Sequence, residues 1–300
     1  MFIDTHTHMD HRRFDSERNA ILNVARDSGI KVMINPAIDF ETNYTMRIKL
    51  DTYDWILYGV GIHPNRLGLG NIMDEEWESG LLKLVTKDNS KVVAIGETGL
   101  DFHRLSRNSI GELDENGIVS LGRQYKWFRK QIQLALLVNL PLILHVRNAN
   151  EENVRAANEV APDRKIDYID AHKEAIKVLN EYCNDLSLDV KGVVHCFNST
   201  HIDDAKMYIS MGYMLGIGGA ITYEQNEGLR EIVREIPMDS IVLETDSPYV
   251  MPEGLPGKRN TPINIPYIVR TIADLKGIDV KDVERITTDN AKRLFQLKDF

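Results

Sequence analysis

The sequence predicts a single (β/α)₈ barrel, the TIM-barrel fold, over residues 1–300. Short apolar runs of strand length alternate eight times with segments of helical spacing. Alternating β and α units imply a parallel sheet, and eight such units in about 250–300 residues are typical of this barrel. The competing architecture is an open doubly wound sheet. It is disfavoured because no strand is followed by the glycine-rich dinucleotide or phosphate loop of such sheets.

Each predicted strand is a short apolar run with β-branched residues. The eight runs cover 2–6, 31–37, 56–61, 91–96, 141–146, 192–197, 213–217 and 240–244. Helical spacing between them is clearest at 15–28, 121–138, 201–211 and 227–236, and a final helix is expected near 264–275. Nothing in this pattern marks a second domain.

Two connections are longer than the barrel requires. Residues 103–118 follow the fourth strand and are polar, and residues 148–189 follow the fifth strand and are long enough for two helices. Long insertions after barrel strands lie on the C-terminal face, where active sites occur. We therefore expect these two inserts to form a lid or a substrate rim.

Composition narrows the class of protein. The chain is 43% hydrophobic, has a formal net charge of -9 and contains two cysteines. No apolar run approaches the roughly 20 residues of a membrane span, and the first strand begins at Phe2, which together predict a cytoplasmic protein. The negative charge disfavours a basic face that grips long duplex nucleic acid, although it permits action on nucleic-acid ends.

The first strand ends in a His-x-His pair. Residues two apart in a strand point to the same face, so His6 and His8 are expected to project side by side. Two imidazoles on one stiff element supply half of a metal site.

The same end of the predicted barrel collects further residues of this kind. Polar residues that end strands are often simple loop starts or helix caps when taken singly. Here five strand ends carry only His, Glu or Asp: His6, His8, Glu97, His145, His195 and Asp246. Six such side chains exceed the needs of one tetrahedral ion. They suit two divalent ions about 3.5–4 Å apart, bridged by a carboxylate, as in two-metal hydrolysis.

At this point the chain resembles the TatD family of metal-dependent hydrolases, within the amidohydrolase-like barrel superfamily. The matching stretches run in the family's order from residue 3 to residue 295. They are Asp4-Thr5-His6-Thr7-His8, Gly61-Ile62-His63-Pro64, Gly96-Glu97-Thr98-Gly99-Leu100-Asp101, Leu144-His145-Val146-Arg147, His195-Cys196-Phe197, Glu244-Thr245-Asp246-Ser247-Pro248-Tyr249, Gly257-Lys258-Arg259-Asn260-Thr261-Pro262 and Asn290-Ala291-Lys292-Arg293-Leu294-Phe295. The Glu-Thr-Asp-Ser-Pro-Tyr and Gly-Lys-Arg-Asn stretches, when they occur together, are specific to this family.

The resemblance implies a role for each of these residues. It implies that His6, His8 and Asp246 surround one ion, that His145 and His195 surround the second, and that Glu97 bridges both. Asp246 would also orient or deprotonate the attacking water, and His63 would contact a substrate phosphate. The ions would be Mg²⁺, Mn²⁺ or Zn²⁺, since imidazole ligands favour Zn²⁺ or Mn²⁺ and family nucleases use Mg²⁺.

The resemblance also implies a function. The expected reaction is deoxyribonuclease cleavage of phosphodiester bonds by a hydroxide that the binuclear metal centre activates, with DNA ends as substrate and no membrane or protein partner required. Three alternatives stay open: hydrolysis of a small amide or ester, deacylation of D-aminoacyl-tRNA, and non-catalytic binding. Amide-cleaving relatives in the superfamily often bridge their ions with a carboxylated lysine, whereas Glu97 occupies that place here.

Several further residues have an expected role or position. Arg147, Lys258 and Arg259 could hold a phosphodiester or could form surface salt bridges. Asp4 could orient a ligand or pair with a buried cation. Strand alternation predicts that Cys196 faces away from His195. Solvated positions are expected for His11, His103, His172 and His201. The chain departs from the family pattern at Pro256, Val146 and Asn198-Ser199, which alters the rim of the site.

Overall fold

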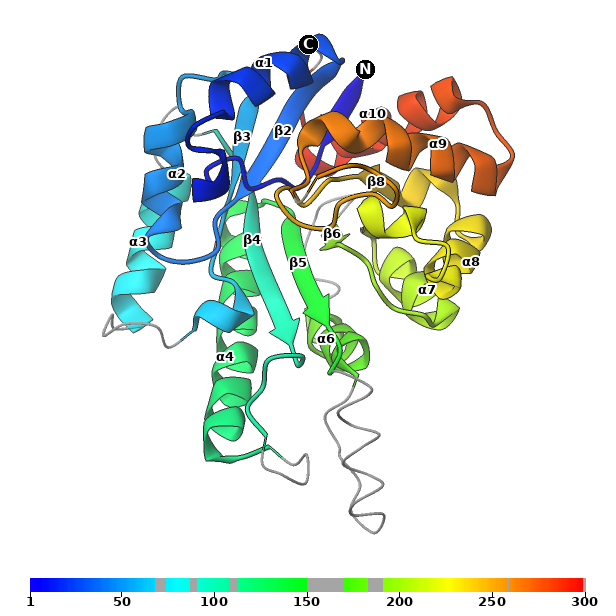
Figure 1. Ribbon diagram of the computed structural model, residues 1–300. Helices are drawn as coiled ribbons and strands as arrows, with labels where there is room; N and C mark the ends of the chain where they lie inside the picture. The colour runs from blue at the N-terminus through cyan, green and yellow to red at the C-terminus, as the bar shows by residue number, and fades with distance from the viewer. Residues whose placement is uncertain are drawn as a thin grey trace.

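Eight parallel strands form the barrel that the sequence predicts. The computed structural model describes residues 1–67, 74–86, 91–107, 113–149, 170–182, 191–257 and 259–298. The strands pair in chain order (Figure 1): β1 Phe2–Asp4, β2 Ile30–Pro36, β3 Ile56–Val60, β4 Val92–Asp101, β5 Leu142–Arg147, β6 Gly192–His195, β7 Tyr213–Ile217 and β8 Ile241–Leu243. The Thr5 amide donates to the Leu243 carbonyl at 2.9 Å, which joins the first strand segment to the last.

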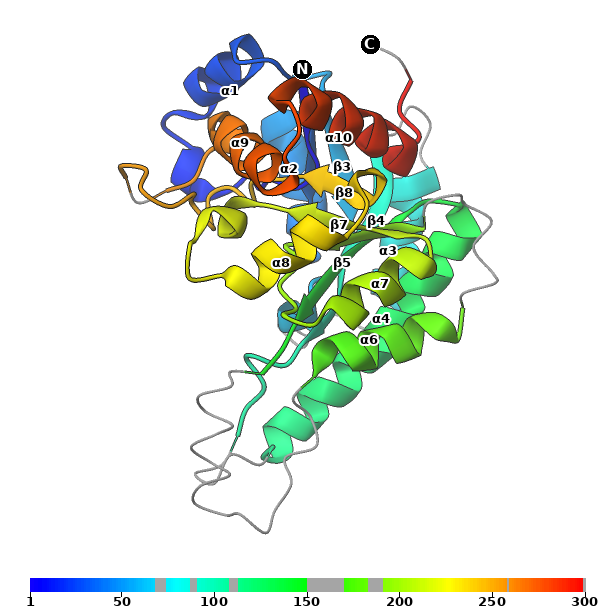
Figure 2. The same cartoon turned by 90° about the vertical axis from the view of Figure 1, so that its right-hand side faces the viewer.

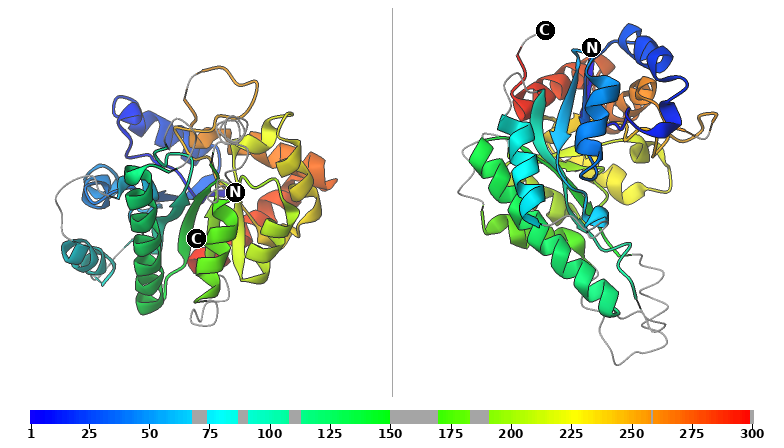
Figure 3. Two further views of the ribbon diagram at one scale, coloured as in Figure 1. Left: turned by 90° about the horizontal axis from the view of Figure 1, so that it is seen from below. Right: turned by 90° about the vertical axis from the view of Figure 1, so that its left-hand side faces the viewer.

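Helices surround the strands on the outside. They are α1 Arg18–Asp27, α2 Thr42–Leu50, α3 Asp74–Thr86, α4 Glu115–Val138, α6 Ala171–Asn180, α7 Ile202–Ser210, α8 Glu227–Glu235, α9 Ile265–Lys276 and α10 Val280–Phe295. Seen from below, the strands lie inside the ring of helices (Figure 3), and α7, α8 and α9 cover the side of the barrel formed by β7 and β8 (Figure 2).

Strand alternation explains how the barrel carries polar side chains at one end. Ile143, Val193 and Val242 belong to the small apolar cluster inside the barrel, whereas their neighbours along the chain pack against the helices. A side chain two residues further along the same strand faces the same way. His145, His195 and Glu244 therefore stand above the apolar interior, at the C-terminal ends of β5, β6 and β8.

The last helix closes the other end of the barrel. Ala291, Leu294 and Phe295 of α10 join the apolar cluster inside the barrel, and α10 lies across the N-terminal side of the strands (Figure 1). The helix that we predicted near 264–275 is confirmed as α9, but it is not the final helix, because α10 follows it. Its stretch from Asn290 to Phe295 stood out only as a family-like motif, without a helix assigned to it.

Two strand boundaries differ from the prediction in ways that matter for the site. β1 ends at Asp4, and the chain bends at Thr5 and His6, so His6 and His8 follow the strand rather than end it. β4 runs on to Asp101, because Thr98 to Asp101 continue to pair with β5 after an irregularity at Gly96 and Glu97. The strand thus carries two carboxylates into the barrel mouth.

Helix α4 anchors two strand ends through buried glutamines. Gln131 accepts from the Ile62 amide at 2.8 Å and donates to the Ile62 carbonyl at 3.0 Å. Gln124, two helical turns away on the same face, accepts from the Asp101 amide at 2.8 Å and donates to the Asp101 carbonyl at 3.1 Å. Each amide side chain acts as a short strand edge, because it satisfies both backbone groups of one residue.

The two predicted inserts are described only in part. Residues 108–112, 150–169 and 183–190 lie outside the described residues, so the two-helix content of the second insert stays a prediction. The described helix of that segment, α6, packs beside β5 and α7, which is the ordinary position of a barrel helix. The single-domain assignment also stays a prediction. No helix among the described residues is long and apolar enough to cross a membrane.

Candidate metal centre

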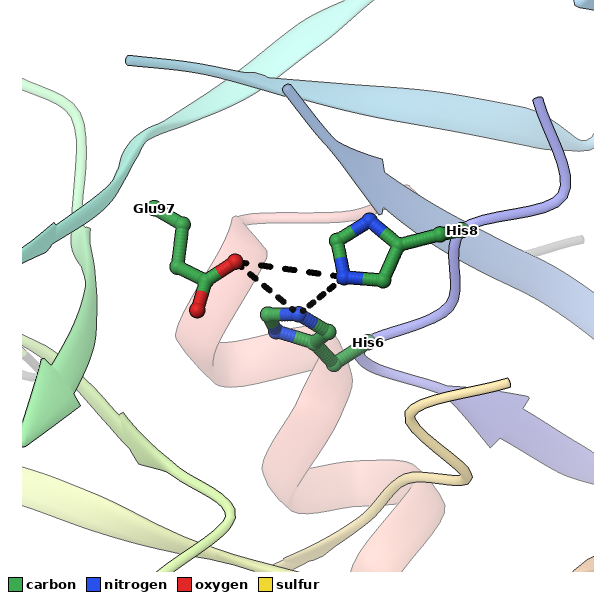
Figure 4. Close-up of side chains that lie close together, drawn as sticks. All are labelled: His6, His8 and Glu97. Atoms are coloured by element: carbon green, nitrogen blue, oxygen red, sulfur yellow. Dashed lines mark hydrogen bonds and ion pairs between the residues drawn. The ribbon is translucent and has the colours of Figure 1, made fainter. Parts of the chain in front are cut away.

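Four side chains converge at the mouth of the barrel beside β1. The Nε2 atoms of His6 and His8 lie 3.2 Å apart, and Glu97 Oε2 lies 3.6 Å from the first and 3.9 Å from the second (Figure 4). Asp246 Oδ1 lies 3.9 Å from His6 Nε2 and 3.5 Å from His8 Nε2. Ligands on a tetrahedral ion with bonds of about 2.1 Å lie roughly 3.4 Å apart. These four atoms therefore have the spacing of one coordination sphere.

A second group shares Glu97. Its other oxygen, Oε1, lies 2.8 Å from His145 Nδ1 and 3.8 Å from His195 Nε2. The ligand atoms of Glu97, His145 and His195 all lie within 4.8 Å of one another. The two oxygens of one carboxylate thus face two separate groups of imidazole nitrogens, which is the arrangement that a bridging carboxylate needs.

Backbone geometry brings Glu97 into this position. The pairing of β4 with β5 shifts between Ile95 and Thr98, so Glu97 sits on a β-bulge, a feature that redirects side chains at active sites. Gly96 has a φ of +142°, and a Cβ atom there would lie 2.4 Å from the Ile143 carbonyl oxygen. Only glycine fits at this position, because both the angle and the space exclude a side chain.

Hydrogen bonds between the segments after β1 and β8 hold the first group together. The Asp246 amide donates to the His6 carbonyl at 2.9 Å, and the His8 amide donates to the Ser247 carbonyl at 2.8 Å. Asp4 is buried and accepts from the Thr245 hydroxyl at 2.6 Å and from the Thr245 amide at 3.0 Å. Asp4 also accepts from the His6 amide at 3.3 Å, so it ties the two segments together through Thr245 and the His6 backbone and pairs with no cation among the described residues.

The charges in the centre favour binding of a cation. Burial opposes ionisation of Glu97, but His63, His145 and His6 outweigh it and hold the pKa of Glu97 well below its usual range. Burial would lower the pKa of His8, yet Asp246 and Glu97 raise it to about 9. The same balance, with Asp101 and Glu97 as the acidic neighbours, raises the pKa of His145 to about 9. Both imidazoles therefore lie where their acidic neighbours favour positive charge.

Two carboxylates that we did not assign to the site orient its histidines. Asp101 Oδ2 lies 3.1 Å from His145 Nε2, and Glu244 Oε1 lies 3.1 Å from His195 Nδ1. In both rings the carboxylate faces the nitrogen that points away from Glu97. The contact of His145 is a hydrogen bond, and it is the carboxylate–histidine–metal relationship, in which the outer carboxylate sets the tautomer of the ligand. Glu244 lies close to His195 Nδ1 but forms no hydrogen bond with it. Both residues lie in the stretches quoted above, and strand alternation from Val242 could have placed Glu244 inside.

His63 lies beside the centre in a defined tautomer. Its Nδ1 accepts from the Asn65 amide at 3.0 Å, so the proton of the neutral ring is on Nε2, which lies 3.4 Å from Glu97 Oε1. Burial and the neighbouring His145 lower the pKa of His63 to about 3. A neutral ring with a proton on Nε2 is a hydrogen-bond donor and a poor metal ligand.

A cavity of about 790 Å³ opens above these groups. It is lined by His8, His63, Glu97, Asp101, His145, His195 and Asp246, and also by Arg66, Arg104, Arg147, Cys196 and Tyr249. Arg147 therefore lies where a substrate would bind. Arg259 is not among the lining residues: it pairs with Glu17 at 2.6 Å, donates to the Arg13 carbonyl and lies over the Phe14 ring. Lys258 lies outside the described residues.

Two smaller expectations were wrong. Cys196 lines the cavity because β6 ends at His195 and the chain then turns, with a φ of +45° at Cys196, so strand alternation no longer applies. Burial raises the pKa of its thiol well above the usual range, which favours the neutral thiol. His172 is fully buried rather than solvated; it lies 3.2 Å from Asn198 Oδ1 and 3.3 Å from the Tyr208 hydroxyl.

Comparison with known proteins shows the family of the chain. The family model described as TatD related DNase matches residues 3–296. The metal-dependent hydrolase YabD of Bacillus subtilis is 30% identical over 297 residues, which cover 99% of this chain and all of that protein. The chain belongs to the TatD family. Within this family, the 3'-5' ssDNA/RNA exonuclease TatD of a Rahnella species is 31% identical, with 95% of this chain and 94% of that protein covered.

Solved structures agree with the TatD assignment. The crystal structure of YjjV, a TatD homologue from Escherichia coli, matches with a TM-score of 0.80 at 26% identity, covering 99% of this chain and 98% of that one. The chain is therefore a metal-dependent hydrolase with the TIM-barrel fold, as its sequence predicts.

Proposed function

We propose that the protein is a binuclear phosphodiesterase that cleaves DNA from strand ends. The observation that carries the proposal is Glu97, whose two oxygens face His6 and His8 on one side and His145 and His195 on the other. His6, His8 and Asp246 would hold one ion, His145 and His195 the other, and Glu97 both. Two such ions would supply Lewis acidity and a water of lowered pKa.

The protein's own residues have separate tasks in this proposal. Asp246 reaches the first group through Oδ1, and its pKa is held below the usual range because His8, His195 and His6 outweigh the effect of burial. It therefore stays a carboxylate that can accept a proton from the attacking water. His63, with its proton on Nε2, would donate a hydrogen bond to a phosphate oxygen. Arg147, at the end of β5 in the cavity wall, would bind the same group.

Two observations favour a phosphodiester over a small amide. Among the described residues that line the cavity there is no lysine, and the bridging position is held by Glu97. Arginine side chains, which suit phosphate oxygens by geometry and charge, line the cavity instead. The nuclease relatives from Rahnella and Erwinia, both named 3'-5' ssDNA/RNA exonuclease TatD, support a nucleic-acid substrate.

The test is hydrolysis of single-stranded DNA labelled at either end, by metal-stripped protein with Mg²⁺, Mn²⁺ or Zn²⁺ added back. Glu97→Gln removes the bridging charge at nearly constant shape, and Glu231→Gln makes the same change at an exposed position of α8. We expect metal-dependent stepwise shortening, lost at least about 100-fold in Glu97→Gln and kept in Glu231→Gln. Absence of cleavage with every ion, from protein that binds two ions per chain, would refute the DNA substrate.

A further inference from the structure

Three arginines line the cavity. Arg66 follows β3, Arg104 follows β4 and Arg147 ends β5, and all three are exposed. The strands β3, β4 and β5 are neighbours in the barrel, so the three residues belong to neighbouring strand ends. Burial lowers the pKa of His103, and the charges of Arg147 and Arg104 lower it further, so both act on one small region. We call these three residues the arginine wall.

No acidic partner of the arginine wall occurs among the described residues, whereas several arginines of the outer surface have one. Within the described ranges, none of the three has a carboxylate oxygen within 4.0 Å of its guanidinium nitrogens. On the outer surface, in contrast, Arg129 contacts Glu181 through two bonds of 2.8 and 2.6 Å, and Arg234 contacts Glu227 at 2.6 Å. In a chain with 45 acidic residues and 36 basic ones, three unpaired guanidinium groups in one cavity point to an anionic ligand.

The charge balance of the centre indicates how much negative charge of a ligand the arginine wall could offset. Four carboxylates face the centre, those of Glu97, Asp101, Glu244 and Asp246. They would neutralise two divalent ions, and an attacking hydroxide would add a further negative charge. Arg66, Arg104 and Arg147 are then the main source of positive charge. One of their charges offsets the hydroxide, which leaves roughly two for the substrate.

We propose that Arg66, Arg104 and Arg147 form a subsite for a second phosphate, the one next to the phosphate that is cleaved. This rests on the proposed phosphodiesterase function and names its substrate class: oligonucleotides with at least two phosphodiester groups, in preference to a dinucleotide with one. The scissile phosphate lies at the Glu97 centre, and its neighbour along the strand lies against the arginine wall.

The test is calorimetric binding of two thymidine ligands in Mn²⁺, both with phosphorothioate linkages that resist cleavage. One is the dinucleotide, with a single linkage, and the other is the tetranucleotide, with three. We expect the tetranucleotide to bind at least about ten-fold more tightly to the wild type. The double variant Arg66→Gln/Arg104→Gln should lose most of this ratio, and the salt dependence of tetranucleotide binding should fall by about 0.7 for each arginine removed.

The matched control is Arg285→Gln, which removes an exposed arginine of α10, at the opposite end of the barrel. It should keep the ratio of the two affinities. A wild-type ratio within two-fold of one, or a ratio that survives in the double variant, would overturn the subsite. Binding is measured without turnover, so a protein that cleaves no DNA but shows the expected ratio would refute only the proposed reaction.

Discussion

The outer carboxylates Asp101 and Glu244 face the histidines of the metal centre. Glu244→Gln and Asp101→Asn keep the shape of each side chain but remove the charge that faces His195 and His145. We expect each variant to bind Mn²⁺ about 10–100-fold more weakly, since carboxylates behind metal-bound histidines typically contribute that much. Competition with a chromophoric chelator measures the affinity. Asp203→Asn, an exposed position of α7, is the matched control, and an unchanged affinity in both variants would contradict the assigned role.

The residues at the barrel mouth were predictable to different degrees. The sequence pattern predicted which side chains meet, because His, Glu and Asp at strand ends of a barrel converge wherever the exact strand boundaries fall. It did not predict Asp101 or Glu244 as partners of the histidines, since that requires knowing which ring nitrogen faces which carboxylate. It also misplaced Cys196, because a single left-handed residue ends the alternation.

Elements fix the site through contacts that leave little trace in the sequence. The alternation of strands and helices was readable because apolar spacing changes from two to nearly four residues between them. Three other features could not be read from the sequence: the bulge at Glu97, the bend after β1 and the closing helix α10. Each of them depends on pairing with a distant segment. The paired bonds of Gln124 and Gln131 to strand ends belong to the same class, since a buried glutamine looks like any polar residue of α4.

The anchoring of strand ends by these glutamines can be tested by substitution. Gln131→Leu leaves the Ile62 amide and carbonyl and the Thr98 hydroxyl without their partner. Each buried group left unpaired costs about 1–3 kcal/mol, so we expect the urea midpoint of unfolding to fall clearly. Cleavage by the folded variant should also weaken, because Ile62 precedes His63. Gln133→Leu, exposed on the same helix, should change the free energy of unfolding by less than about 0.5 kcal/mol. Equal effects of the two variants would contradict the anchoring role.

At the scale of the molecule, the barrel separates stability from chemistry. Its lower interior is apolar and closed by α10, and its mouth holds the ionisable groups. This division was predictable, because parallel strands direct all their C-terminal ends to one face. The substrate could not be predicted from the sequence, because it depends on the side chains at the rim of the cavity. There, the described parts of the two predicted inserts contribute Arg104 and Asn148 to the cavity.

Anomalous scattering from crystals grown with Mn²⁺ would show whether Glu97 bridges two ions. We expect two peaks in each chain about 3.5–4 Å apart. One should lie among His6, His8 and Asp246, the other should contact His145 and His195, and both should contact Glu97. A single peak, or two peaks of which only one contacts Glu97, would contradict the binuclear centre.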